Sequence, residues 1–165
     1  MQIRKALPKD ITAINEIYNQ AVATKTTGDL LPLSIQQTTE WFYQHHPLSY
    51  PVLVAEVNNI VVGWLSFSAY RNGRQAFKHT AEISYYIHND YQRQGIGSKF
   101  IEHALQAATA FHFTNLFAIV LDNNEASIKM LRKFHFTQWA YMPGIANFDG
   151  HFCGHVYYGI CLLEK

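Results

Sequence analysis

Two glycines lie where they could help the backbone bind a phosphate group. The run Gln92-Arg93-Gln94-Gly95-Ile96-Gly97 follows a β-rich segment and precedes a helical pattern. At such a turn, free backbone N–H groups and the helix dipole converge on one point, which suits a pyrophosphate. A tight turn that binds no ligand explains the pattern equally well when it is taken alone.

Two nucleotide-binding classes do not fit this loop. No Gly-Lys-Ser/Thr ends it, which excludes a Walker P-loop. The chain has only one strand-helix-strand crossover, and no acidic residue closes a second strand, which disfavours a dinucleotide-binding fold.

A carboxylate lies in the strand ahead of the loop. Glu82 is flanked by Ala81 and Ile83, and a carboxyl group among apolar neighbours has its pKa raised by desolvation. Glu82 is therefore a candidate general base. The alternative is an ion pair with a nearby Arg or Lys.

The composition is that of one folded domain spanning residues 1–165. Hydrophobic residues make up 48% of the chain, and 13 basic against 12 acidic side chains give a net charge of +1 without a basic block. We therefore expect no nucleic-acid partner. No apolar run is long enough to span a membrane and no signal segment is evident, so we expect no membrane partner and a cytoplasmic location.

The two cysteines are expected to be free. Cys153 and Cys161 lie eight residues apart in one predicted strand, and about 26 Å of extended chain is too long for a disulfide. Free thiols are typical of a reducing compartment.

Strands and helices are predicted in a mixed order. Strands are expected at residues 3–6, 51–57, 60–67, 79–88, 116–121, 137–147 and 152–162. Helices are expected at residues 11–21, from a Ser34-x-x-Gln37 capping box to about Pro47, around residues 100–108, and from Glu125 to Phe134. Asn58-Asn59 and Asp149-Gly150 are typical of hairpin turns. Residues 79–121 predict a right-handed crossover between parallel strands.

This order of elements and the glycine loop resemble the GNAT superfamily of N-acetyltransferases. Five short motifs also resemble the landmarks of its phosphinothricin and methionine-sulfone acetyltransferase branch, over nearly the whole chain. They are INEIYN (14–19), PVLVAE (51–56), HTAEIS (79–84), NEASI (124–128) and MPGIA (142–146). The resemblance implies an α/β fold with a mostly antiparallel sheet of six to seven strands, splayed centrally, with helices on both faces. It also implies a homodimer.

The same resemblance implies acetyl-CoA as co-substrate and no metal. The backbone of Tyr85, Tyr86 and Ile87 would pair with the pantetheine arm. A further set would bind the pyrophosphate, namely Arg93, Gln94, Gly95, Ile96, Gly97 and Ser98. Asn124 would reach the pantetheine, with a simple helix N-cap as the alternative role.

For the reaction, the resemblance implies a small amine acceptor and Glu82 as base, acting through water. Only the free amine attacks a thioester, and an α-amino group has an ordinary pKa of about 7.7–8.0. Relatives often protonate the departing thiolate with a tyrosine, where this chain has Leu131. A thiol pKa of about 8.5 makes the thiolate a tolerable leaving group without that acid. Tyr141 and Tyr157 are candidate substitutes.

The acceptor side is expected to include loop residues. The resemblance implies that the acceptor is contacted by Asn72, Gly73, Arg74, Glu82, Ser84 and Gly144. Arg74 would bind an acidic group of the acceptor. Exposed loop arginines are otherwise simply solvated. Phe152 and Gly154 stand where relatives show Trp-x-Asp. A weakly catalytic CoA-binding sensor, and an enzyme acting on protein or peptide amines, therefore stay as alternative functions.

Two histidine features need separate explanations. His151, Cys153 and His155 alternate in a predicted strand and could present three zinc ligands. A polar hairpin rim explains them more simply, because no fourth ligand is evident. His135 takes a position where relatives have a glycine in left-handed conformation, which a histidine adopts at some cost.

Overall fold

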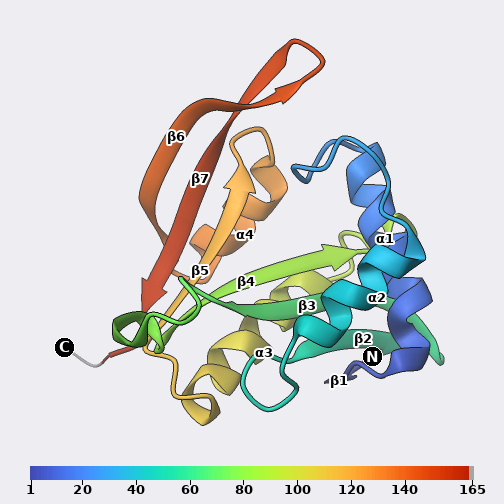
Figure 1. Ribbon diagram of the computed structural model, residues 1–165, viewed down its shortest axis with the longest axis horizontal. Helices are drawn as coiled ribbons and strands as arrows, with labels where there is room; N and C mark the ends of the chain where they lie inside the picture. Colours follow the sequence, from blue (N-terminus) through green and yellow to red (C-terminus); the bar gives the residue numbers. More distant parts are fainter. Residues whose placement is uncertain (164–165) are drawn as a thin grey trace.

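The computed structural model describes residues 1–163 and contains one seven-stranded sheet with helices on both faces (Figure 1). The strands are β1 (Gln2–Lys5), β2 (Val52–Val57), β3 (Ile60–Ala69), β4 (Thr80–Ile87), β5 (Asn115–Leu121), β6 (Thr137–Phe148) and β7 (His151–Cys161). The helices are α1 (Ile11–Ala23), α2 (Ile35–Gln44), α3 (Ile96–Ala110) and α4 (Glu125–Lys133). The predicted α/β fold is confirmed.

The sheet has the order β1-β2-β3-β4-β5-β7-β6. Every neighbouring pair is antiparallel except β4 and β5, which are parallel and are joined by α3. The predicted crossover between parallel strands is therefore confirmed.

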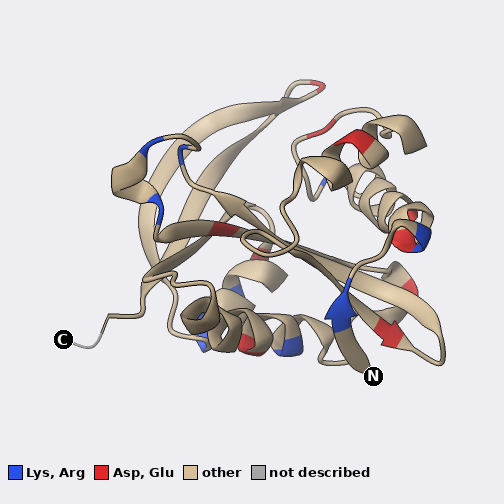
Figure 2. Ribbon diagram, turned by 60° about the horizontal axis from the view of Figure 1, so that its bottom comes forward, with Lys and Arg blue, Asp and Glu red and all other residues tan. Residues whose placement is uncertain are grey.

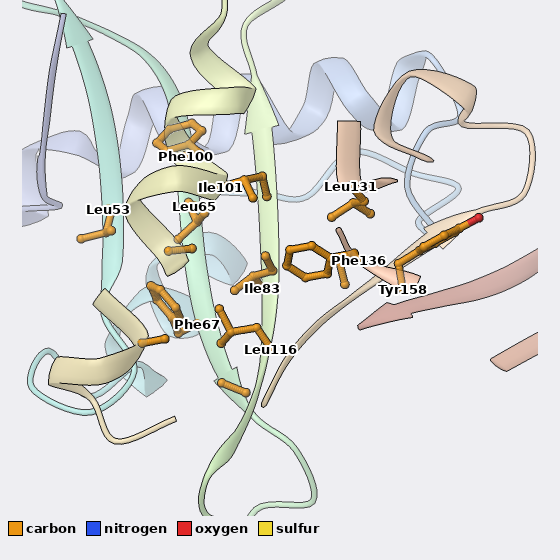
Figure 3. Packing of buried hydrophobic residues seen from close by; sticks show 14 of the residues in the cluster. Leu53, Leu65, Phe67, Ile83, Phe100, Ile101, Leu116, Leu131, Phe136 and Tyr158 are labelled. Carbon is orange, nitrogen blue, oxygen red and sulfur yellow. The ribbon is translucent and has the colours of Figure 1, made fainter. Parts of the chain in front are cut away.

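Alternating side chains divide the core between the two faces of the sheet. On β2, Leu53 and Ala55 belong to the larger hydrophobic cluster, whereas Val52 and Val54 belong to the smaller one. The larger cluster lies under α3 and α4 and includes Phe100, Ile101, Leu131 and Phe136 (Figure 3). The smaller cluster lies under α1 and α2. This two-sided burial explains why the strands are rich in apolar residues.

The centre of the sheet opens between β4 and β5. Only Thr80, Ala81 and Glu82 of β4 pair with β5, opposite Asn115, Leu116 and Phe117. Beyond these pairs the two strands diverge (Figure 1). The predicted central splay is therefore present, and it exposes unpaired main-chain groups along both strands.

The β6–β7 hairpin extends beyond the rest of the sheet and carries no Lys, Arg, Asp or Glu in either strand (Figure 2). β6 is exposed over nearly its whole length. Large apolar side chains such as Trp139, Ile145 and Phe152 are 47%, 56% and 67% exposed. Cys153 and Cys161 both lie in β7 as free cysteines, as predicted.

Local signals explain where several elements begin and end. Asn58 and Asn59 have φ values of 50° and 64°, and Asp149 and Gly150 have 54° and 94°, so both predicted hairpin turns use left-handed residues. Ser34 accepts a hydrogen bond from the Gln37 N–H at 3.2 Å and completes the predicted capping box. Within residues 1–163, no helix has the length and apolar character needed to cross a membrane.

The end of α4 confirms the unusual backbone predicted for His135. This residue has φ of 64°. Its N–H donates to the Arg132 carbonyl at 3.0 Å, and the Phe136 N–H donates to the Leu131 carbonyl at 3.1 Å. These two bonds form a Schellman motif, which needs a left-handed residue at the position of His135.

Replacing His135 with Gly should therefore stabilise the fold by about 0.5–1 kcal/mol, because relief of left-handed strain exceeds the extra entropy of glycine in the unfolded chain. Urea denaturation of both proteins measures the difference. His135→Ala is the matched control, since it removes the imidazole and keeps the strain. A gain in His135→Ala as large as that in His135→Gly would show that the imidazole, not the backbone, is unfavourable.

Candidate active site

A cavity of about 610 Å³ opens in the splay between β4 and β5. Its walls also include the first turns of α3 and α4. Nearly all residues predicted to bind the co-substrate line it, namely Tyr85, Tyr86, Ile87, Arg93, Gly95, Ile96, Gly97, Ser98 and Asn124. Gln94 is the exception, because its side chain turns back and donates to the Asp90 carbonyl at 3.1 Å. Residues far apart in the sequence thus form one site.

The N-terminus of α3 presents free donors to this cavity. Gly95 is the N-cap in left-handed conformation, with φ of 82°, and has no side chain to cap the helix. The Lys99 N–H donates to the Gly95 carbonyl at 3.1 Å. The amides of residues 96–98 therefore precede the first intrahelical hydrogen bond and lack an acceptor in the helix. Such amides suit an anion.

The two glycines of the loop have different roles. A Cβ atom on Gly95 would meet no atom within 4 Å, so only its left-handed backbone requires glycine. A Cβ atom on Gly97 would lie 2.6 Å from Met130 Sδ and 3.3 Å from Ile87 Cδ1. Gly97 therefore allows α3 to pack closely against α4 and β4. A left-handed turn thus explains Gly95, whereas close packing explains Gly97.

The larger cavity is positively charged. Arg93, Lys129 and Lys133 line it, and no Asp or Glu of the described chain does so. Lys129 also pairs with Glu125 at 2.8 Å on the surface of α4. Cationic side chains around free amides favour a ligand with several phosphate groups.

Hydrogen-bond alternation separates the roles of neighbouring β4 residues. The His88 N–H donates to the Val62 carbonyl of the β3 side at 2.9 Å, and Tyr86 lies opposite Trp64 in the same register. Since main-chain groups alternate along a strand, those of Tyr86 face β3, whereas those of Tyr85 and Ile87 face the splay. The main chain of Tyr85 and Ile87 can therefore pair with a ligand, as predicted. The main chain of Tyr86 cannot, because it faces β3, and Tyr86 lines the cavity with its ring.

The position of Asn124 is compatible with both roles that the sequence leaves open. Its Oδ1 accepts a hydrogen bond from the Ser127 N–H at 3.2 Å, so it is the N-cap of α4. It also lines the larger cavity. Because capping uses only the oxygen, the amide Nδ2 can still donate to a ligand.

A second cavity, of about 340 Å³, lies on the α1 and α2 side of β4. Glu82, Ser84 and Tyr86 project into it from alternate positions of β4. Ser84 and Tyr86 line the larger cavity as well. The two cavities therefore meet at β4, where they share Ser84 and Tyr86, and Ser84 is two residues after Glu82.

Glu82 has the electrostatic environment expected of a base. Burial raises the pKa of its carboxyl group, and the Ser84 hydroxyl acts in the opposite direction. Glu82 has no salt-bridge partner within residues 1–163. Glu82 thus forms no ion pair with an Arg or Lys of this part of the chain, and the carboxylate can accept a proton.

The loop residues predicted to grip the acceptor lie outside both cavities. Asn72, Gly73 and Arg74 are exposed in the connection between β3 and β4, where several basic residues gather (Figure 2). Gly144 is exposed in β6, with φ of 63°. Their contacts with an acceptor stay predictions.

Several residues of the second cavity were not predicted from the sequence. Tyr18, Asp29, Trp41 and Trp64 line the second cavity together with Glu82. Tyr18 belongs to the INEIYN motif, which could have drawn attention to it. The other three carry no local signal, since tertiary packing brings them together.

The tyrosines considered as acids lie away from the cavities. Leu131 is fully buried in the core, the Tyr141 hydroxyl donates to Asp122 at 3.0 Å, and Tyr157 stacks on Phe117 with ring centroids 6.3 Å apart. Tyr85 lines the larger cavity instead. Burial raises the pKa of Tyr85 to about 12, so its hydroxyl stays protonated.

The zinc site considered for β7 would use three alternating side chains. His151, Cys153 and His155 all lie in β7. Within residues 1–163, no three His, Cys, Asp or Glu side chains are arranged to bind a metal ion. Cys153 Sγ instead accepts a hydrogen bond from Asn123 Nδ2 at 3.3 Å.

The splayed seven-stranded fold is that of an acetyltransferase, and the chain belongs to the acetyltransferase (GNAT) family, whose profile matches residues 14–136. It is 31% identical to the L-amino acid N-acyltransferase MnaT of Escherichia coli (strain K12), over 100% of this chain and 96% of that protein. It is 34% identical to the L-methionine sulfoximine/L-methionine sulfone acetyltransferase of Salmonella typhimurium, over 88% of this chain and 85% of that one.

One of the solved structures that are similar to this chain contains the co-substrate. The phosphinothricin acetyltransferase of Sinorhizobium meliloti, in complex with AcCoA, superposes with a TM-score of 0.91 at 25% identity. The match covers 98% of this chain and 88% of that one. The resemblance read from the sequence motifs is thus confirmed at the level of family and fold.

Proposed function

We propose that this chain transfers the acetyl group of acetyl-CoA to the amine of a small amino-acid-like acceptor. One observation carries the proposal: a cavity with three cationic side chains and a cavity with two carboxylates meet at β4. The first suits a polyanionic coenzyme and the second suits an ammonium group. The relatives are named as enzymes that acylate amino acids or their analogues, and these names support an amino-acid-like acceptor.

In this proposal the chain itself binds and aligns the reactants. The amides of residues 96–98, with Arg93, bind the pyrophosphate, and the splay-facing main chain of Tyr85 and Ile87 aligns the pantetheine arm. The bound coenzyme supplies the thioester that the amine attacks. Unpaired N–H groups along the splay stabilise the oxyanion that forms from its carbonyl.

Glu82 serves as the general base. The acceptor enters the second cavity as an ammonium ion, and the Glu82 carboxylate removes its proton, through water. The free amine then attacks the thioester across the meeting point of the two cavities. Since a thiolate with a pKa of about 8.5 departs readily, no acid at Leu131 is required.

A panel of amines tests the proposal most broadly. Purified protein is incubated with acetyl-CoA and one amine at a time, and thioester consumption is followed. Free amino acids and their sulfone, sulfoximine and phosphinothricin analogues should be acetylated faster than peptides or a protein N-terminus. Faster turnover of peptides would instead favour the protein-acetylating alternative.

The alternative of a CoA-binding sensor has one observation in its favour. Leu131, at the position of the usual acid, is fully buried and cannot donate a proton. Tight coenzyme binding with slow turnover of every amine would support the sensor.

A homodimer also stays a prediction. The surface that supports it is the exposed β6–β7 hairpin, whose two strands carry no Lys, Arg, Asp or Glu.

A further inference from the structure

A buried hydroxyl group lies in the connection between α1 and α2. It belongs to Thr27, which is 8% exposed. The neighbouring residues Thr26 and Asp29 line the larger and the second cavity respectively, whereas Thr27 lines neither cavity of the described chain. A buried hydroxyl group normally has hydrogen-bond partners. The partners of Thr27 Oγ1 are the hydroxyl groups of Tyr18, at 2.9 Å, and Tyr86, at 3.4 Å.

These contacts join four side chains into one chain of hydrogen bonds with a fixed direction. The Tyr18 hydroxyl donates to Asp29 Oδ2, and an ionised carboxylate can only accept. Because a hydroxyl group has a single proton, Tyr18 must accept from Thr27, and Thr27 in turn must accept from Tyr86. Burial raises the pKa of Tyr18 and of Tyr86, so both phenol groups keep the protons that the chain needs.

The direction of the chain decides what Tyr86 can offer to a ligand. Tyr86 lines both cavities. Because its proton points to Thr27, its oxygen can only accept a hydrogen bond from a bound molecule. Glu82 lies on the same face of β4, and its carboxylate also accepts. The two residues therefore suit a ligand that donates from several N–H groups, as an ammonium ion does.

Aromatic packing holds the ring of Tyr86 independently of its hydroxyl group. The centroid of the ring lies 4.6 Å from that of Trp64 and 5.0 Å from that of Tyr18. The ring contacts Tyr18 by its edge, which is a favourable geometry for two aromatic rings. Loss of the bond to Thr27 therefore frees the hydroxyl proton to rotate but leaves the ring in place.

A second group of hydroxyls lines the same cavity without belonging to this chain. It comprises Thr38, Ser66, Ser68 and Ser84. Hydroxyl groups can donate to oxygen atoms of an acceptor, including those of an acid group. The inference that follows therefore concerns the amine alone and excludes no charge on the rest of the acceptor.

We infer that Tyr86 is a further acceptor-binding residue, whose oxygen receives an N–H of the acceptor's amine, and that Thr27 orients it. The inference rests on the proposed function. It adds one residue that touches the substrate and one positioning residue that acts only through Tyr86. Bonds to Glu82 and Tyr86 hold the amine at β4, where the two cavities meet.

Thr27→Val breaks the chain of hydrogen bonds without changing a residue of either cavity. Valine has the shape of threonine but no hydroxyl group, and the bond from Tyr18 to Asp29 is kept. Thr27→Ser keeps the hydroxyl group, so its affinity for an acceptor should stay within about twofold of the wild type. Tyr86→Phe removes the accepting oxygen and keeps the ring. Tyr43→Phe is the matched control, since Tyr43 lies on α2 and is 65% exposed.

Methionine sulfone and its deaminated analogue, methylsulfonylbutanoate, form a matched pair of probes, because they differ only in the amine. Trp41 and Trp64 line the second cavity, so tryptophan fluorescence should report the Kd of each probe without turnover. Thr27→Val and Tyr86→Phe should each weaken binding of methionine sulfone by about tenfold, as expected for loss of a hydrogen bond to a charged group. Binding of methylsulfonylbutanoate should change by less than about twofold. The double variant should bind no more weakly than Tyr86→Phe alone.

Three results would overturn the inference. They are an unchanged affinity of Tyr86→Phe for methionine sulfone, an equal loss for both probes, and losses that multiply in the double variant. The last result would mean that Thr27 acts independently of Tyr86.

The binding measurement also separates this inference from the proposed transfer. Losses confined to the probe with an amine, in a protein that acetylates no amine, would support the inference and contradict the transfer. Acetylation of methionine sulfone with unchanged binding in Tyr86→Phe would do the reverse.

Discussion

Replacing Glu82 with Gln should lower kcat by about 100-fold or more, the usual effect of losing a general base, and should leave the Kd for acetyl-CoA unchanged. Glu82 lines the second cavity, where we propose that the acceptor binds, and not the larger cavity proposed for the coenzyme. The amide of Gln keeps the size of the side chain but cannot accept a proton from the ammonium ion. Steady-state kinetics and calorimetry on the same preparation measure the two effects separately.

The pH dependence gives a second signature of the same change. Only the ionised form of Glu82 is a base, and burial raises its pKa. In the wild type, kcat/KM should therefore rise with pH through this raised pKa, and Glu82→Gln should lose that limb of the profile. Glu102→Gln on the exposed surface of α3 is the control. Undiminished turnover in Glu82→Gln would remove Glu82 from the mechanism.

The loss of activity in Glu82→Gln should not come from unfolding of the variant. Because the folded-state pKa of Glu82 is raised, the fold loses stability as pH rises from the unfolded-state pKa through the folded-state pKa. At neutral pH the ionised Glu82 is thus unfavourable to the fold. The uncharged Gln variant should unfold at the same or a higher temperature than the wild type.

Replacing Gly95 with Asp should weaken acetyl-CoA binding by about 100-fold or more, which corresponds to about 2.7 kcal/mol. The substitution puts a carboxylate at the N-terminus of α3, where the free amides of residues 96–98 are proposed to bind the pyrophosphate. Like charges repel, and the left-handed backbone adds strain. Calorimetric titration with acetyl-CoA measures the loss.

Gly150→Asp is the matched control for this strain. Gly150 has φ of 94°, and a Cβ atom added there meets nothing within 4 Å, as at Gly95. It lies in the β6–β7 turn, away from both cavities. The two variants should therefore lose similar stability, but only Gly95→Asp should lose affinity. Normal coenzyme affinity in a folded Gly95→Asp variant would exclude the proposed pyrophosphate site.

The residues that line the larger cavity could be predicted to lie together because the elements that carry them are local. A strand, a left-handed glycine and a helix N-terminus follow one another between Thr80 and Ser98, and each has a recognisable sequence signal. Even here tertiary packing decided two roles. Gly97 is needed for contact with Met130 on α4, and Gln94 turns away toward Asp90.

The second cavity, where we propose that the acceptor binds, could not be predicted in the same way. Its walls come from α1, α2, β3, β4 and the connection after α1, so no short motif contains them. Asp29 lies in a turn-rich segment without periodicity, and Trp41 is indistinguishable in sequence from an ordinary core residue. Arg74 is exposed and lies outside both cavities, so its contact with an acceptor stays a prediction.

Calorimetric titration of the purified wild-type protein with acetyl-CoA tests the central claim most directly, namely that the cationic splay between β4 and β5 holds the coenzyme. We predict saturable binding of one molecule per chain, with an affinity that falls as salt screens Arg93, Lys129 and Lys133. Absence of any binding of acetyl-CoA or CoA to the folded protein would contradict the account.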